Sequence, residues 1–159
     1  MSPPIRRRLR QTSMYQHILL PVDGSELAER ALREAIQLAR VLSSRLRVIH
    51  IVSSTPLITQ GTPEVMEELL TQMRSRGESI IHEAKVAARA ADVTVDATLI
   101  EAIGERAGKY VVAEANDWPA ELIVCGTHGR SGLNRLLMGS DAEYIVRHSP
   151  VPVLLIRAS

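Results

Sequence analysis

Short apolar runs alternate with longer segments of helical periodicity along most of this chain. The runs are rich in Val, Ile and Leu and are bounded by turn residues, as the buried strands of a parallel sheet are. We predict strands at His17–Val22, Leu46–Val52, Val93–Ile100, Leu122–Cys125 and Val151–Ile156.

Helices are predicted between the strands, because apolar residues recur there every three to four positions. The second helix keeps its apolar phase past Gly77, so we predict one long helix with a weak point rather than two helices. The expected helices are Leu27–Leu42 after a cap at Asp23 or Ser25, Pro63–Ala91 after Thr62, Ala107–Ala115, and Asp141–His148 after Ser140.

This alternation of strands and helices predicts an α/β fold with a single, Rossmann-like domain. We expect an open parallel sheet of five strands in the order 3-2-1-4-5, with helices on both faces and right-handed crossovers.

The fourth predicted strand is followed by a loop rich in glycine, with Gly126, Gly129, Gly132 and Gly139 in close succession. Such glycines serve either tight turns or a close approach of the backbone to a ligand. The loop also holds several hydrogen-bond donors and no carboxylate, and the helix after it offers free N–H groups to an anion. It lacks the lysine of a P-loop and the glycine order of a dinucleotide-binding turn. We therefore interpret it as a phosphate-binding loop.

The spacing Gly126-x2-Gly129-x9-Gly139-Ser140 resembles the nucleotide-binding signature of the universal stress protein family. The resemblance extends to His17–Ser25 and Ser149–Ile156, so it covers about residues 15–157. It implies a site for ATP or another adenine nucleotide, with or without Mg, in a stress-response switch or sensor. Members of this family usually begin near the position of Met14. Residues 1–14 are therefore either an extension of the domain or the result of a translation start assigned upstream of the real one.

Asp23 ends the first strand at the edge where open α/β sheets bind ligands. Phosphates would repel its carboxylate, so its expected partner is a ribose hydroxyl or an adenine amine, and a helix-capping role can coexist with this one. Ile51 is expected to offer its backbone to an adenine, whereas we read His50 as a packed side chain rather than a ligand. The expected nucleotide-binding residues are Pro21, Val22, Asp23, Ile51, Gly126, Thr127, His128, Gly129, Arg130, Ser131, Gly132, Gly139, Ser140, Asp141 and Ala142.

Two of these residues depart from the family pattern. ATP-binding members often have small or hydroxyl-bearing residues after the serine of the motif, where this chain has Asp141 and Ala142. An acid in the first turn stabilises its own helix, but it competes with an anion for the same N–H groups.

Catalysis is weakly supported by the sequence. No catalytic triad or metal-ligand spacing is legible, and His128 is a loop donor or a base. We expect no catalytic residue and no resident metal site, and at most weak ATP hydrolysis or autophosphorylation.

Composition and charge exclude other classes. The 159 residues are 45% hydrophobic and 23% charged, as in an ordinary globular domain. Residues 1–14 hold four arginines and no acid, which leaves 15 of the 19 basic residues against 18 acids in the rest of the chain. That body carries about −3, so we expect no nucleic-acid partner. No apolar segment reaches the length of a membrane span, so no membrane partner is expected. The single Cys125 suggests a reducing cytoplasm.

We expect a basic disordered tail at residues 1–14 and a nucleotide-binding domain at residues 15–159. An arm that binds nucleic acid or anionic lipid is the alternative for the tail.

The last predicted strand, Val151–Ile156, lies at an edge of the expected sheet and carries no lysine. Unpaired strand edges attract other chains, and the resemblance also implies a homodimer through this strand. Cover by neighbouring helices is the alternative. The competing functions are a dimeric interaction module without nucleotide, and a slow ATPase or self-phosphorylating protein. The sequence does not identify a downstream protein partner.

Overall fold

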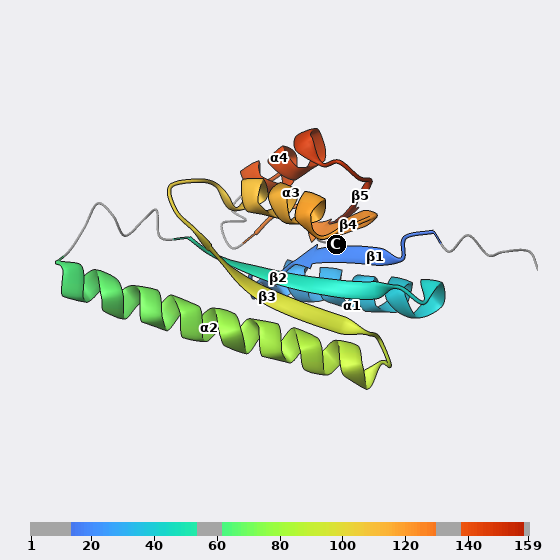
Figure 1. Cartoon of the computed structure of the whole chain (residues 1–159), viewed down its shortest axis with the longest axis horizontal. Helices are drawn as coiled ribbons and strands as arrows, with labels where there is room; N and C mark the ends of the chain where they lie inside the picture. The colour runs from blue at the N-terminus through green and yellow to red at the C-terminus, as the bar shows by residue number, and fades with distance from the viewer. Residues whose placement is uncertain (1–13, 54–61, 130–137, 158–159) are drawn as a thin grey trace, which may run out of the picture.

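The computed structural model describes residues 14–53, 62–129 and 138–157. Their core is one sheet of parallel strands in the order β3-β2-β1-β4-β5 (Figure 1), which confirms the predicted sheet. Along the chain the elements are β1 (His17–Pro21), α1 (Glu26–Leu42), β2 (Arg45–Ser53), α2 (Pro63–Ala90), β3 (Val95–Ala102), α3 (Ala107–Asp117), β4 (Leu122–Gly126), α4 (Ser140–His148) and β5 (Val153–Ile156).

Some predicted strand ends were wrong by one or two residues, and hydrogen bonds explain two of them. The N–H of Val93 donates to the carbonyl of Ala88 and so closes the end of α2 instead of joining β3. The N–H of Val151 donates to Oγ of Ser149 in a turn before β5. Backbone groups engaged in such turns cannot also pair in the sheet.

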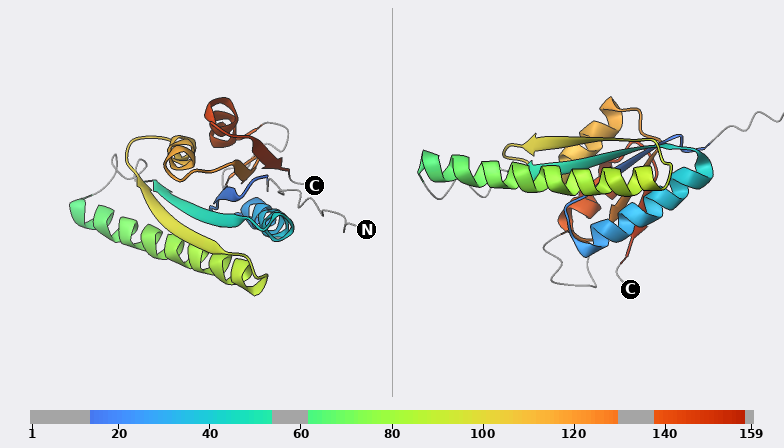
Figure 2. Two further views of the ribbon diagram at one scale, coloured as in Figure 1. Left: turned by 45° about the vertical axis from the view of Figure 1, so that its right-hand side comes forward. Right: turned by 90° about the horizontal axis from the view of Figure 1, so that it is seen from below.

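Each face of the sheet has its own apolar core, because successive residues of a strand point to opposite faces. Ile18 and Leu20 of β1 pack with α1 and α2, whereas Leu19 packs with α3 and α4. Figure 2 shows α2 running along β2 and β3, with α3 and α4 on the opposite side of the sheet. The prediction of helices on both faces is confirmed.

The helix α2 is continuous over 28 residues, as predicted, but Gly77 is not a weak point in it. Gly77 is buried, and a Cβ atom added there would lie 2.6 Å from Cδ2 of His50 and 2.8 Å from Cδ1 of Leu99. The missing side chain therefore lets α2 lie close against β2 and β3.

The structure shows which residue caps α1, and it corrects the predicted cap of α4. Ser25 is the N-cap of α1, since its Oγ accepts a hydrogen bond from the N–H of Ala28. Ser140 does not cap the last helix: α4 begins at Ser140 itself, its N-cap is Gly139, and no side-chain capping bond is formed.

Candidate functional site

A cavity of about 520 Å³ lies at the carboxyl ends of β1, β2 and β4. Ligands of open α/β sheets bind at this edge, next to the strand from which the chain winds in both directions. That strand is β1, which has β2 on one side and β4 on the other. The volume lies in the range of small-molecule pockets.

The turn after β1 places Asp23 in the cavity wall. Gly24 has a φ of 76°, a left-handed conformation that glycine adopts without strain. The turn is fixed by the N–H of Ser25, which donates to Oδ1 of Asp23 at 2.9 Å. Asp23 thus orders the turn while Ser25 caps the helix, and the Asp23 side chain still lines the cavity.

Gly126, which ends β4, and Gly129 after it leave little room for a side chain. None of Gly126, Gly129 and Gly139 has the left-handed φ that marks Gly24 and Gly104. A Cβ on Gly126 would lie 2.9 Å from Cγ of Leu27, and one on Gly129 would lie 2.8 Å from Oδ2 of Asp23. Tight turns alone therefore do not explain these two glycines.

A backbone hydrogen bond closes the base of this loop. The N–H of Gly139 donates to the carbonyl of Thr127 at 2.8 Å, and the N–H of Thr127 donates to the carbonyl of Ile156 in β5 at 2.9 Å. The end of β4 and the start of α4 therefore lie side by side at the cavity. His128 lines the cavity, and its Nδ1 lies 3.0 Å from Oγ1 of Thr127.

His50 is a packed residue of the cavity wall, as predicted. It is only 4% exposed, and its Nδ1 hydrogen-bonds to the carbonyl of Val22 at 2.8 Å. Because a carbonyl only accepts, Nδ1 carries the proton in this contact. The histidine so ties the end of β2 to the residue that follows β1.

Asp141 belongs to α4, but its carboxylate reaches another helix. Its Oδ1 accepts a hydrogen bond of 2.8 Å from the N–H of Gly108, in the first turn of α3. This bond joins the first turns of α3 and α4, a contact that the sequence did not indicate. Arg106 is the N-cap residue of α3, but its side chain makes no capping hydrogen bond.

Cys125 lines the cavity from β4 and is 3% exposed. Burial raises the pKa of its thiol to about 12, because the low-dielectric surroundings disfavour the thiolate. A neutral thiol is a poor nucleophile, so Cys125 contributes to the wall rather than to covalent chemistry.

The sequence profile of the universal stress protein family matches residues 14–157. The chain belongs to the universal stress protein family. The universal stress protein YxiE of Bacillus subtilis is 30% identical to it over 151 residues, which is 91% of this chain and all of that protein. The structure of UspA from Lactobacillus plantarum has a TM-score of 0.79 and 26% identity, covering 91% of this chain and 99% of the other. A family member from Burkholderia pseudomallei has a TM-score of 0.75 and 31% identity, covering 92% and 98%.

Other similar structures of universal stress proteins hold nucleotides. One is a complex with cAMP, one from Archaeoglobus fulgidus is a complex with dAMP, and one from Arabidopsis thaliana has AMP bound. Their TM-scores are 0.62, 0.63 and 0.66, and their identities to this chain are 24%, 23% and 15%.

Most of the residues that the universal stress protein signature selected line this cavity together. They are Pro21, Val22, Asp23, Ile51, Gly126, His128, Gly129, Gly139, Ser140, Asp141 and Ala142. Thr127 lies at the base of the loop, outside the described lining. Arg130, Ser131 and Gly132 lie outside the described residues.

The start of α3 is the part of the wall that sequence reasoning missed. Ala107, Gly108 and Val111 line the cavity next to the start of α4. A signal was available, because α3 follows β3 and therefore begins at the same edge of the parallel sheet as the predicted site. No motif at Ala107–Gly108 distinguishes it from an ordinary helix start.

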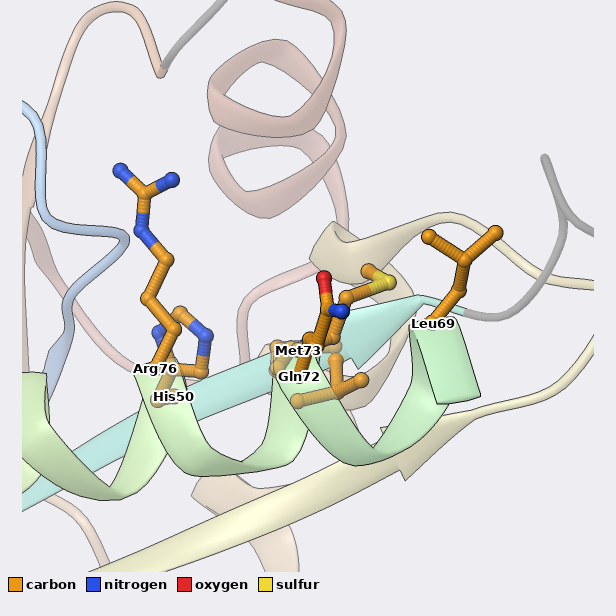
Figure 3. Close-up of a pocket in the computed structure, with 7 residues that line it drawn as sticks. His50, Leu69, Gln72, Met73 and Arg76 are labelled. Carbon is orange, nitrogen blue, oxygen red and sulfur yellow. The ribbon is translucent and has the colours of Figure 1, made fainter. Parts of the chain in front are cut away.

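A smaller hollow of about 190 Å³ adjoins the cavity between α2 and the end of β2 (Figure 3). His50 and Ile51 line both spaces. Arg76 and His50 lie at one end of the hollow and Leu69 at the other, with Gln72 and Met73 between them (Figure 3).

Within the described part of the chain, no cluster of His, Cys, Asp and Glu has the geometry of a metal site. None of the described helices combines the length and the apolar character that a membrane-crossing helix needs.

Proposed function

We propose that this universal stress protein binds an adenine nucleotide in the 520 Å³ cavity and acts as a stress-response switch or sensor in the cytoplasm. The observation that carries the proposal is the convergence of the signature glycines, Asp23 and the start of α4 on one cavity at the switch point of the sheet. The complexes of similar structures with AMP, dAMP and cAMP support the same class of ligand.

Each part of the cavity suits a part of such a ligand. Apolar wall residues such as Val22 and Ile51 can face the adenine, and the carboxylate of Asp23 can accept hydrogen bonds from ribose hydroxyls. The loop base at Gly129 and Gly139 and the N-terminus of α4 can face phosphate. The signature implies ATP, with Mg as an optional companion, as one form of this ligand.

The proposed role is binding rather than turnover. His128 contacts the hydroxyl of Thr127, and the described lining has no lysine or arginine that would stabilise a transferring phosphoryl group. Slow hydrolysis or autophosphorylation remains the alternative that a phosphate-release assay tests.

A homodimer through β5 is part of the proposal. The strand lies at the edge of the sheet, and Leu154 at its centre is 38% exposed. An apolar edge strand with unpaired backbone groups favours pairing with a second copy.

The deciding experiment is mass spectrometry of the ligand released from freshly purified protein, followed by calorimetry with adenosine, AMP and ATP. Gly129→Val should weaken binding of the nucleotides at least tenfold, or about 1.4 kcal/mol, because the added side chain projects at Asp23 and into the cavity. The matched control is Gly104→Asn: a Cβ there meets nothing within 4 Å, and asparagine tolerates the left-handed backbone. Unchanged affinity in a folded Gly129→Val protein would refute this site.

A further inference from the structure

The cavity brings the N-termini of two helices together and places a carboxylate between them. Asp141 lies in the first turn of α4, and its Oδ1 accepts the N–H of Gly108 in the first turn of α3 at 2.8 Å. The contact is close along the backbone too, because a Cβ on Gly108 would lie 2.8 Å from the carbonyl oxygen of Asp141. Both Asp141 and Gly108 line the cavity.

A helix N-terminus attracts anions through its free N–H groups and its dipole. Here the protein's own carboxylate already occupies one of those N–H groups and sets its negative charge against the positive end of α3. Part of the attraction that two helix N-termini would exert on a ligand anion is thereby cancelled within the protein.

The rest of the described lining holds no lysine or arginine. Its ionisable residues are Asp23, His50, His128, Asp141 and the neutral thiol of Cys125. The carboxylates of Asp23 and Asp141 reach the cavity from different elements, the turn after β1 and the first turn of α4. Each further phosphate on a ligand therefore adds repulsion without adding a described ion pair.

We propose that Asp141 determines the number of phosphates that the cavity accepts, disfavouring ATP relative to AMP and adenosine. This inference rests on the proposed adenine-nucleotide site and deepens it. The nucleoside part contacts the apolar wall and Asp23 whatever the phosphate chain, so the selection acts at the α3–α4 end of the cavity. Repulsion by the half-buried carboxylate of Asp141 grows with the charge of the ligand, and it is partly screened when a magnesium ion accompanies the phosphates.

Asp141→Asn is the sharpest variant, because the asparagine oxygen can still accept the N–H of Gly108 while the charge is lost. Asp117→Asn is the matched control: it makes the same change in net charge on an exposed residue at the far end of α3, outside the cavity lining. Both variants and the parent protein are titrated calorimetrically with adenosine, AMP and ATP, first with a chelator and then with magnesium.

We expect Asp141→Asn to tighten ATP by about tenfold, to tighten AMP by a smaller factor and to leave adenosine unchanged. Magnesium should reduce the gain for ATP, and Asp117→Asn should change none of the three affinities. Equal changes in affinity for the three ligands would overturn the inference. So would a parent protein that binds ATP more tightly than AMP, if Asp141→Asn leaves that preference unchanged. In those two cases the adenine-nucleotide site itself would stand. If the parent and both variants bind none of the ligands, the proposed function fails and the inference falls with it.

Discussion

For Gly77→Ala, helix propensity predicts a more stable protein, whereas packing predicts a less stable one. In an exposed helix, alanine is more favourable than glycine by about 1 kcal/mol. In α2 the new Cβ would lie 2.6 Å from Cδ2 of His50 and 2.8 Å from Cδ1 of Leu99. Distances below about 3 Å are shorter than carbon atoms tolerate, so one of the neighbours must move.

Displacing the His50 ring would cost free energy. It is 4% exposed, and it is held by a 2.8 Å hydrogen bond to the carbonyl of Val22, which contributes about 1 kcal/mol. Overpacking of a well-filled core costs about 1–3 kcal/mol. After the gain of about 1 kcal/mol in propensity is subtracted, we expect Gly77→Ala to lower the free energy of unfolding by up to about 2 kcal/mol, or by up to several degrees in Tm.

Urea denaturation followed by circular dichroism measures this change. Ser79→Ala, on the exposed face of the same helix, is the control for propensity and should stabilise the protein slightly. The double variant His50→Ala/Gly77→Ala isolates the contact: without the ring, the alanine at position 77 should no longer destabilise the protein.

Two results would refute the reasoning. One is a Gly77→Ala protein more stable than the parent by the full propensity gain of about 1 kcal/mol, which would show that the new methyl group meets no clash. The other is an equal loss in the His50→Ala background, which would place the clash on Leu99 or on the backbone instead of on His50.

Three further changes test other parts of the structure. Leu154→Lys should give a folded monomer by sedimentation velocity, because it places a charge on the exposed centre of β5; a parent protein that is already monomeric at micromolar concentration would end the dimer proposal. Cys125, whose pKa is raised by burial to about 12, should resist iodoacetamide at pH 8 in the folded protein and react in urea, and rapid native labelling would contradict its burial. Gly108→Ala should lower the free energy of unfolding by about 1–3 kcal/mol by pushing α3 from α4, and unchanged stability would show that the helices separate freely.

The sequence was sufficient for the strand order and for most of the cavity wall. Both follow from local patterns: apolar runs alternate with helical segments, and right-handed crossovers leave few arrangements of the strands. The signature glycines and Asp23 all lie directly after strands, so the parallel sheet necessarily brings them to one edge. Boundaries were less predictable, since the N–H of Val93 is engaged by the end of α2 in a way that no local pattern encodes.

What the sequence could not give are contacts between elements far apart along the chain. From the sequence, Gly77 looks like a defect in a helix, but the structure places the ring of His50, from strand β2, directly against it. Asp141 reads as a first-turn acid of its own helix until Gly108, 33 positions earlier, is found as its partner. In each case the spacing along the chain has no relation to the spacing in the fold.

These two distant contacts have a common consequence for the site. Gly77 lets α2 press on His50, which holds Val22, and Gly108 lets α3 approach Asp141, so both glycines fix cavity walls although neither belongs to the nucleotide signature. The signature loop thus accounts for one side of the cavity, whereas the shape and charge of the other sides depend on how α2 and α3 dock. If Asp141 selects among nucleotides as proposed, two family members with the same signature can differ in ligand preference through a residue outside the signature glycines.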